Sequence, residues 1–69
     1  MTDNEYEAAI YELRQQQAAA DEDVRRAYWA YKSEPTSATL ANRLDTAYYR
    51  QKSIVMQIER LIQQRDGGA

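Results

Sequence analysis

The amino-acid sequence predicts an all-α fold in which two long helices pack as an antiparallel, coiled-coil-like hairpin. Helix breakers are confined to Pro35, near the middle of the 69 residues, and to Gly67 and Gly68. Strong helix formers such as Ala, Glu, Gln, Arg and Leu dominate on both sides of the proline. Apolar residues recur at alternating spacings of three and four residues, as on one face of a helix. A chain of this length forms one small domain, so residues 1–69 are treated as a single helical hairpin.

The first helix is expected to span about residues 3–33. At its start, Thr2 and Glu5 fit a capping box, in which the Thr hydroxyl accepts a backbone N–H bond and the Glu side chain reaches back. Pro35 has no N–H to donate and disfavours helical backbone in the residue before it. The first helix should therefore end near Ser33.

The second helix is expected over about residues 37–65, after a turn at about 34–36. Either Thr36 or Ser37 can cap its N-terminus, because both side chains carry a hydroxyl acceptor. The glycine pair near the end of the chain provides a C-terminal stop. Residues 66–69 should then form a short flexible tail.

Both predicted helices carry a heptad pattern, written abcdefg, in which the a and d positions form an apolar seam. Ile10 and Leu44 are taken as a positions. The seam residues are Tyr6, Ile10, Leu13, Gln17, Ala20, Val24, Ala27 and Tyr31 in the first helix and Leu40, Leu44, Ala47, Gln51, Ile54, Ile58, Leu61 and Arg65 in the second. Folding at the proline pairs residues whose numbers sum to about 71, so that an a position meets a d position across the hairpin. Small residues then face large ones near the turn, which favours close packing.

Polar residues occur within this seam and along its g edge. Gln17 and Gln51 lie one layer apart at a positions. A buried amide pair would fix the alignment or the oligomeric state, whereas amides that reach solvent would not, and the sequence leaves both possibilities open. At the g edge, Asp23 faces Arg50 and Gln16 faces Gln57, and these pairs are expected to stay at the surface.

The second helix has a wider apolar surface than the seam alone. Its e column consists of Ala41, Tyr48, Val55 and Ile62, whereas the e column of the first helix is Glu7, Arg14, Asp21 and Tyr28. In a lone hairpin we expect Tyr48, Val55 and Ile62 to remain substantially exposed. A helix that is apolar at a, d and e contacts more than one neighbour. We therefore predict a homodimer that forms a four-helix bundle, with a self-association interface made by Ala41, Tyr48, Val55, Met56 and Ile62.

Aromatic residues gather near the expected turn, and Tyr28, Trp29, Tyr31 and Tyr49 are candidate partner-binding residues. The chain has six Tyr and no Phe, and such rings combine an apolar body with a polar edge, as protein interfaces favour. These rings either close the end of a dimer core or anchor a different protein, since Trp and Tyr are frequent in binding hot spots. The sequence does not decide between the two interpretations.

The composition also bears on the class of function. The chain has no His and no Cys, and it lacks a Gly-rich loop that would hold phosphate, so we expect no enzyme, no catalytic residues, no cofactor and no metal. No apolar run approaches the roughly 18 residues of a membrane span, and the acidic start is unlike a signal peptide. We expect a cytoplasmic interaction module without a membrane partner. An adaptor, an inhibitor or a virion or accessory factor of a phage or bacterium would suit this size.

An alternative function is nucleic-acid binding by a small regulatory dimer through Arg26, Arg43 and Arg50. In length and topology the chain resembles the plasmid copy-number control proteins, which are dimeric helical hairpins that bind RNA. The formal net charge is −2, and Asp23 lies among the three arginines. Phosphate binding normally requires a stripe of uncompensated positive charge. We therefore expect the partner to be another protein rather than nucleic acid.

Overall fold

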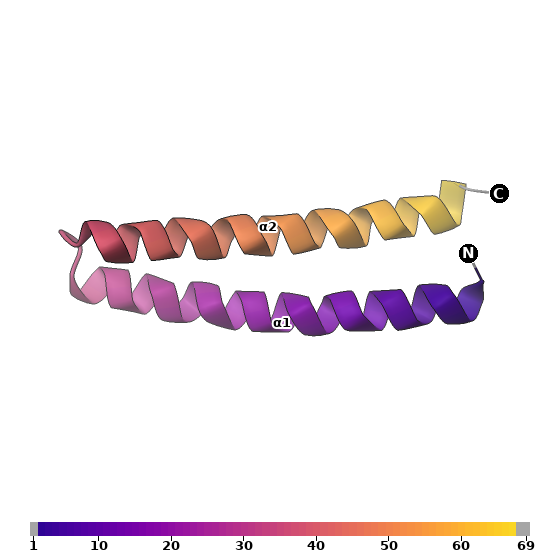
Figure 1. Ribbon diagram of the computed structural model, residues 1–69, viewed down its shortest axis with the longest axis horizontal. Helices are drawn as coiled ribbons and strands as arrows, with labels where there is room; N and C mark the ends of the chain where they lie inside the picture. The colour runs from indigo at the N-terminus through magenta and orange to yellow at the C-terminus, as the bar shows by residue number, and fades with distance from the viewer. Residues whose placement is uncertain (1, 68–69) are drawn as a thin grey trace.

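The computed structural model describes residues 2–67, and these form two helices, α1 (Asp3–Ser33) and α2 (Ala38–Gly67), without a strand. The helices lie side by side and run in opposite directions, with the connecting turn at one end and both ends of the chain at the other (Figure 1). The resulting rod measures 51 × 17 × 12 Å. The all-α hairpin predicted from the sequence is therefore confirmed.

Helix α1 begins with the predicted capping box. The Glu5 N–H donates to Thr2 Oγ1 at 3.2 Å, and the Thr2 N–H donates to Glu5 Oε2 at 3.4 Å. At the other end, the Glu34 N–H donates to the carbonyl oxygens of Ala30 and Tyr31 at 3.3 and 3.1 Å. These bonds satisfy backbone groups that have no partner within a helix at its termini.

A tight turn over residues 34–37 connects the helices. The Ser37 N–H donates to the Glu34 carbonyl oxygen at 3.1 Å, and Pro35 occupies the second turn position, where its fixed backbone angle is favoured. Ser37, not Thr36, caps α2, since the Leu40 N–H donates to Ser37 Oγ at 3.2 Å.

Helix α2 ends later than the sequence predicts. Asp66 and Gly67 lie within the helix rather than in a flexible tail. Gly67 has no positive φ, so it does not adopt the left-handed conformation with which a glycine usually ends a helix. The rest of the predicted tail, residues 68–69, lies outside the described residues.

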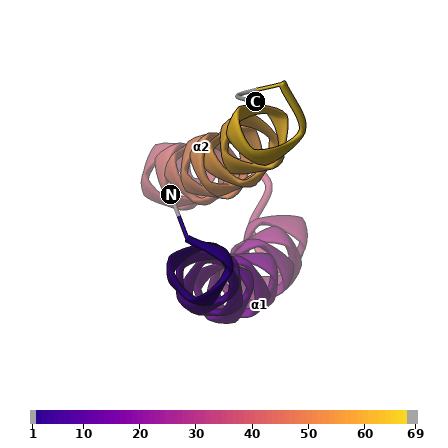
Figure 2. The same ribbon diagram turned by 90° about the vertical axis from the view of Figure 1, so that its right-hand side faces the viewer.

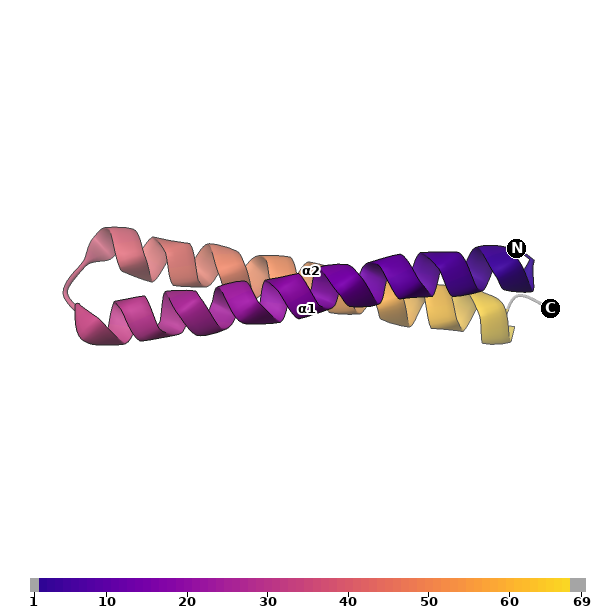
Figure 3. The same ribbon diagram turned by 90° about the horizontal axis from the view of Figure 1, so that it is seen from below.

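The heptad seam forms the contact between the two helices. Its buried residues are Ala20, Ile54 and Leu61, all at d positions. At the open end, the Arg65 guanidinium lies 4.4 Å from the centroid of the Tyr6 ring, which joins two seam positions in the predicted register. Residues 2–67 contain only α1 and α2. The view along the rod shows them side by side (Figure 2), and the view from below shows them crossing at a shallow angle (Figure 3). Every helix therefore has a single neighbour, and most of its circumference faces solvent.

Candidate functional site

The hairpin has two flanks, one on each side of the seam, and each flank carries one polar contact between the helices. On the g flank, Arg50 Nη1 lies 3.1 Å from Asp23 Oδ2, the exposed pair that the sequence predicts. On the opposite flank, Gln51 Nε2 donates to Asp21 Oδ1 at 2.7 Å. Gln51 therefore reaches the edge of the seam, and no polar residue among 2–67 is fully buried. The possible buried amide pair between Gln17 and Gln51 is not formed.

The other two g residues, Gln16 and Gln57, are both exposed, as expected. Gln57 Nε2 donates to Ser53 Oγ within α2, at 3.4 Å. This acceptor is only four residues away, so the two side chains are neighbours on the helix surface.

The flank marked by Asp21 carries the e columns of both helices and is called the e flank here. It consists of Glu7, Arg14, Asp21 and Tyr28 from α1 and of Ala41, Tyr48, Val55 and Ile62 from α2. Tyr48 is 47% exposed, as expected. The expectation that Val55 and Ile62 remain substantially exposed in a lone hairpin is wrong, because both are already half-buried. Their short branched side chains lie close to the seam, whereas the longer Tyr48 ring extends beyond it.

The aromatic residues near the turn fall into three environments. Tyr31 is half-buried at an a position of the seam. Tyr28 and Tyr48, on the e flank, are 39% and 47% exposed, whereas Trp29 and Tyr49, at the outermost f positions, are 59% and 75% exposed. Of the candidate partner-binding residues, Trp29 and Tyr49 are thus the most accessible to another protein.

Tyr28, Trp29 and Lys32 form one cluster on α1. The Tyr28 and Trp29 rings meet edge to face, with centroids 5.6 Å apart and an interplanar angle of 74°. Lys32 Nζ lies 5.6 Å from the Tyr28 centroid and 5.4 Å from the Trp29 centroid, within the range of cation–π attraction. The lysine therefore holds the two exposed rings in a defined arrangement.

Helix α2 carries the same residue spacing in Tyr48, Tyr49 and Lys52. These three residues line a shallow depression of about 250 Å³ together with Asp45. Two adjacent aromatic residues followed by a lysine three positions later thus occur once in each helix, at equivalent e, f and b positions. Sequence reasoning missed this repeat, although its spacing is visible in the sequence.

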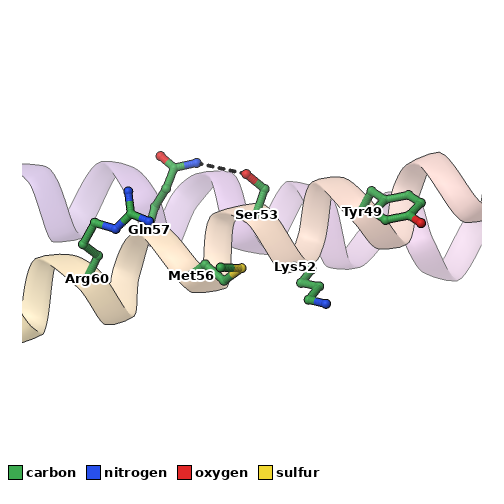
Figure 4. A pocket seen from close by; sticks show the side chains of 6 residues that line it. All are labelled: Tyr49, Lys52, Ser53, Met56, Gln57 and Arg60. Carbon is green, nitrogen blue, oxygen red and sulfur yellow. Dashed lines mark hydrogen bonds between the residues drawn. The ribbon is translucent and has the colours of Figure 1, made fainter.

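A second depression, of about 380 Å³, lies along the outer side of α2 (Figure 4). All of its lining residues come from α2, and Figure 4 shows the α1 ribbon behind them: Tyr49, Lys52, Ser53, Met56, Gln57 and Arg60. Met56 is 50% exposed. Met56 therefore shares a surface with Tyr49, although the sequence analysis grouped it with the self-association residues. The f positions, with Trp29 on α1 and Tyr49 and Met56 on α2, point away from the other helix. They therefore form two outward faces, one on the outer side of each helix, at opposite sides of the rod.

The three arginines proposed for nucleic-acid binding do not form an uncompensated stripe. Arg26 Nε lies 3.3 Å from Glu22 Oε1, and Arg50 is paired with Asp23. Arg43 borders a shallow depression among Thr39, Asn42 and Thr46. Because acidic side chains already accompany two of the three, this surface is a poor match for a phosphate backbone.

Residues 2–67 hold no group of three or more His, Cys, Asp or Glu side chains placed to bind a metal ion. Neither described helix combines the length and the apolar character needed to cross a membrane.

Comparison with known proteins gives no relative from which a function can be transferred. No protein-family model matches the sequence, and neither a curated protein nor a solved structure is significantly similar to it.

Proposed function

We propose that this chain is a non-enzymatic protein–protein interaction module, which self-associates through the e flank and binds another protein through the outward face of α1 or of α2. An adaptor, an inhibitor or an accessory factor would act in this way. The observation that carries the proposal is the exposure of large apolar side chains on a rod with only three buried residues among those described.

The surface area supports self-association. The hairpin exposes 5452 Å². A compact monomer of 8.0 kDa exposes about 4,450 Å² by the usual scaling of area with mass. The excess of about 1,000 Å² is similar to the roughly 800 Å² that each partner buries in a standard interface. Covering one flank with a second copy would bring the area per chain into the normal range.

The chemistry of the e flank also supports this interface. Tyr48 is nearly half exposed, and the apolar column continues through Val55 and Ile62. Small domains seldom bury enough apolar surface to be stable alone, and this chain has no Cys for disulfides. Oligomerisation is the remaining common source of stability.

Both outward faces would remain accessible in such a dimer, because f positions point away from both the seam and the e flank. Trp29 and Tyr49 are the most exposed large side chains near the turn, and Met56 adds an adaptable apolar contact. Exposed Trp and Tyr rings supply much of the binding energy at protein interfaces.

Self-association is tested by sedimentation equilibrium or light scattering over a wide concentration range. We expect a dimer for the native chain and dissociation in the Ile62→Glu variant, because a carboxylate would be buried in the interface. Gln63→Glu, on the adjacent exposed position, is the matched control and should remain dimeric. A native chain that stays folded and monomeric up to millimolar concentration would contradict the proposed self-association.

Partner binding is tested by affinity capture from the native host with three baits. A partner of either outward face should be retained by the native chain and lost with the Trp29→Ala/Tyr49→Ala double variant, which alters both faces. The same partner should still bind the Arg26→Ala/Arg43→Ala variant. If the arginine variant loses the ligand instead, and binding falls steeply with salt, nucleic-acid binding would replace this proposal.

A further inference from the structure

We infer that the two copies pack antiparallel, e flank against e flank, with the turn of one hairpin over the open end of the other. In this arrangement α1 lies against α1 of the second copy, and α2 lies against α2. The inference rests on the self-association proposed above and specifies its geometry.

The α2 columns fit each other in this orientation. The four e residues of α2, Ala41, Tyr48, Val55 and Ile62, are spaced evenly about the middle of the Ala38–Gly67 helix. Antiparallel overlap over the full length therefore brings Tyr48 near Val55 of the second copy, and Ala41 near Ile62. The protruding ring meets a shorter, half-buried side chain, and the smallest residue meets a large one, which fills space without voids.

The e columns of α1 in the two copies also complement each other, but through charged rather than apolar side chains. The e residues of α1 are likewise centred on the Asp3–Ser33 helix. Antiparallel overlap brings Arg14 of each copy near Asp21 of the other, so that two ion pairs form by symmetry. Asp21 is already held at the flank by its hydrogen bond from Gln51 at 2.7 Å, and one carboxylate can accept from both partners.

In a parallel arrangement, the charged e column of α1 would lie against the apolar e column of α2 of the other copy. A two-fold axis along the rod would put α1 of one copy against α2 of the other, with turn beside turn. Arg14 and Asp21 would then face the apolar column that contains Tyr48 and Val55. Burying charged groups against apolar side chains without partners is unfavourable.

The distribution of charge along the rod also favours antiparallel packing of the two copies. The turn half, residues 19–52, has six basic and five acidic residues, a net charge of +1. The open half, residues 1–18 and 53–69, has three basic and six acidic residues, a net charge of −3. Antiparallel packing brings halves of opposite sign together, whereas parallel packing brings the two acidic open halves together.

Spin-label distance measurements on the dimer test this geometry. The chain has no native Cys, so Thr36→Cys at the exposed turn gives one label per copy. Antiparallel packing predicts a label separation close to the 51 Å length of the rod. Parallel packing predicts roughly 10–25 Å, because facing helices lie about 8–10 Å apart. Dilution of the labelled chain with unlabelled chain is the control and should remove the dipolar signal.

A charge exchange provides a second, independent measurement. Arg14→Asp should raise the dimer dissociation constant by about tenfold, because both symmetric pairs become repulsive. Arg14→Asp combined with Asp21→Arg should restore it to within about threefold. Arg60→Asp, on an exposed outer position in the same half of the rod, makes the same change of charge and is the control; it should not weaken the dimer. Circular dichroism of each variant shows whether the helices remain intact.

The outcomes separate the two proposals. A long label distance with rescue by the double exchange supports antiparallel packing. A dimer with a short distance, or one that the exchange does not rescue, overturns the antiparallel inference and leaves the interaction module standing. A chain that is monomeric throughout overturns self-association, and the antiparallel geometry with it.

Discussion

Replacing Tyr48 by Ala should weaken self-association about fiftyfold, whereas the same change at its neighbour Tyr49 should have little effect. The two residues are identical and adjacent, but Tyr48 lies on the e flank and Tyr49 on the outward face of α2. An aromatic side chain presents about 200 Å², so the 47% exposure of Tyr48 leaves about 90 Å² to be covered by a second copy. If half of that area becomes buried, at about 25 cal/mol per Å², each copy contributes about 1.2 kcal/mol and the dimer about 2.4 kcal/mol.

Sedimentation equilibrium measures both dissociation constants directly, and circular dichroism verifies that each variant remains helical. The Tyr49 variant should keep its dissociation constant within about threefold of the native chain while losing a partner that binds the outward face of α2. If both variants weaken the dimer to the same extent, or if Tyr48→Ala leaves it unchanged, the e flank is not the interface.

Three further changes test the hairpin itself, each by chemical denaturation at fixed protein concentration. Ile54→Ala should lower the free energy of unfolding by about 2–5 kcal/mol, because it empties a buried seam position, whereas the exposed Ser53→Ala should change it by less than about 0.5 kcal/mol. Ser37→Ala should cost about 1 kcal/mol through loss of the α2 cap, and an equal loss from Thr36→Ala would contradict that assignment. Arg50→Ala should cost no more than about 1 kcal/mol, because its ion pair is exposed; a larger loss would show that the pair is more than a surface contact.

The fold could be predicted because its determinants are local or periodic. The capping box needs only Thr2 and Glu5 at a fixed spacing, and the break needs only Pro35. The register follows from the heptads, and the Asp23–Arg50 pair was predicted from it. The end of α2 was not predicted, because a glycine permits a helix to stop without requiring it, and Gly67 remains helical.

The candidate site was less predictable, because it depends on how far each side chain reaches. Val55 and Tyr48 share one column, yet only the longer residue stays exposed. Whether Gln51 joins Gln17 or turns to Asp21 depends on side-chain rotamers rather than on heptad position. The contacts of Lys32 with the Tyr28 and Trp29 rings likewise require coordinates.

Because Trp29 is exposed, its intrinsic fluorescence reports whether another protein covers this part of the surface. Trp29 is the only tryptophan of the chain and is mostly in contact with water, so its fluorescence should be red-shifted and readily quenched by acrylamide. A protein that covers the outward face of α1 should shift the emission to the blue and protect the indole, whereas one that covers the outward face of α2 should not. Dimer formation through the e flank should shift the emission less, because it covers the neighbouring Tyr28 ring but leaves the outer side of the indole in water. One unlabelled sample can therefore distinguish occupation of the outward face of α1 from self-association.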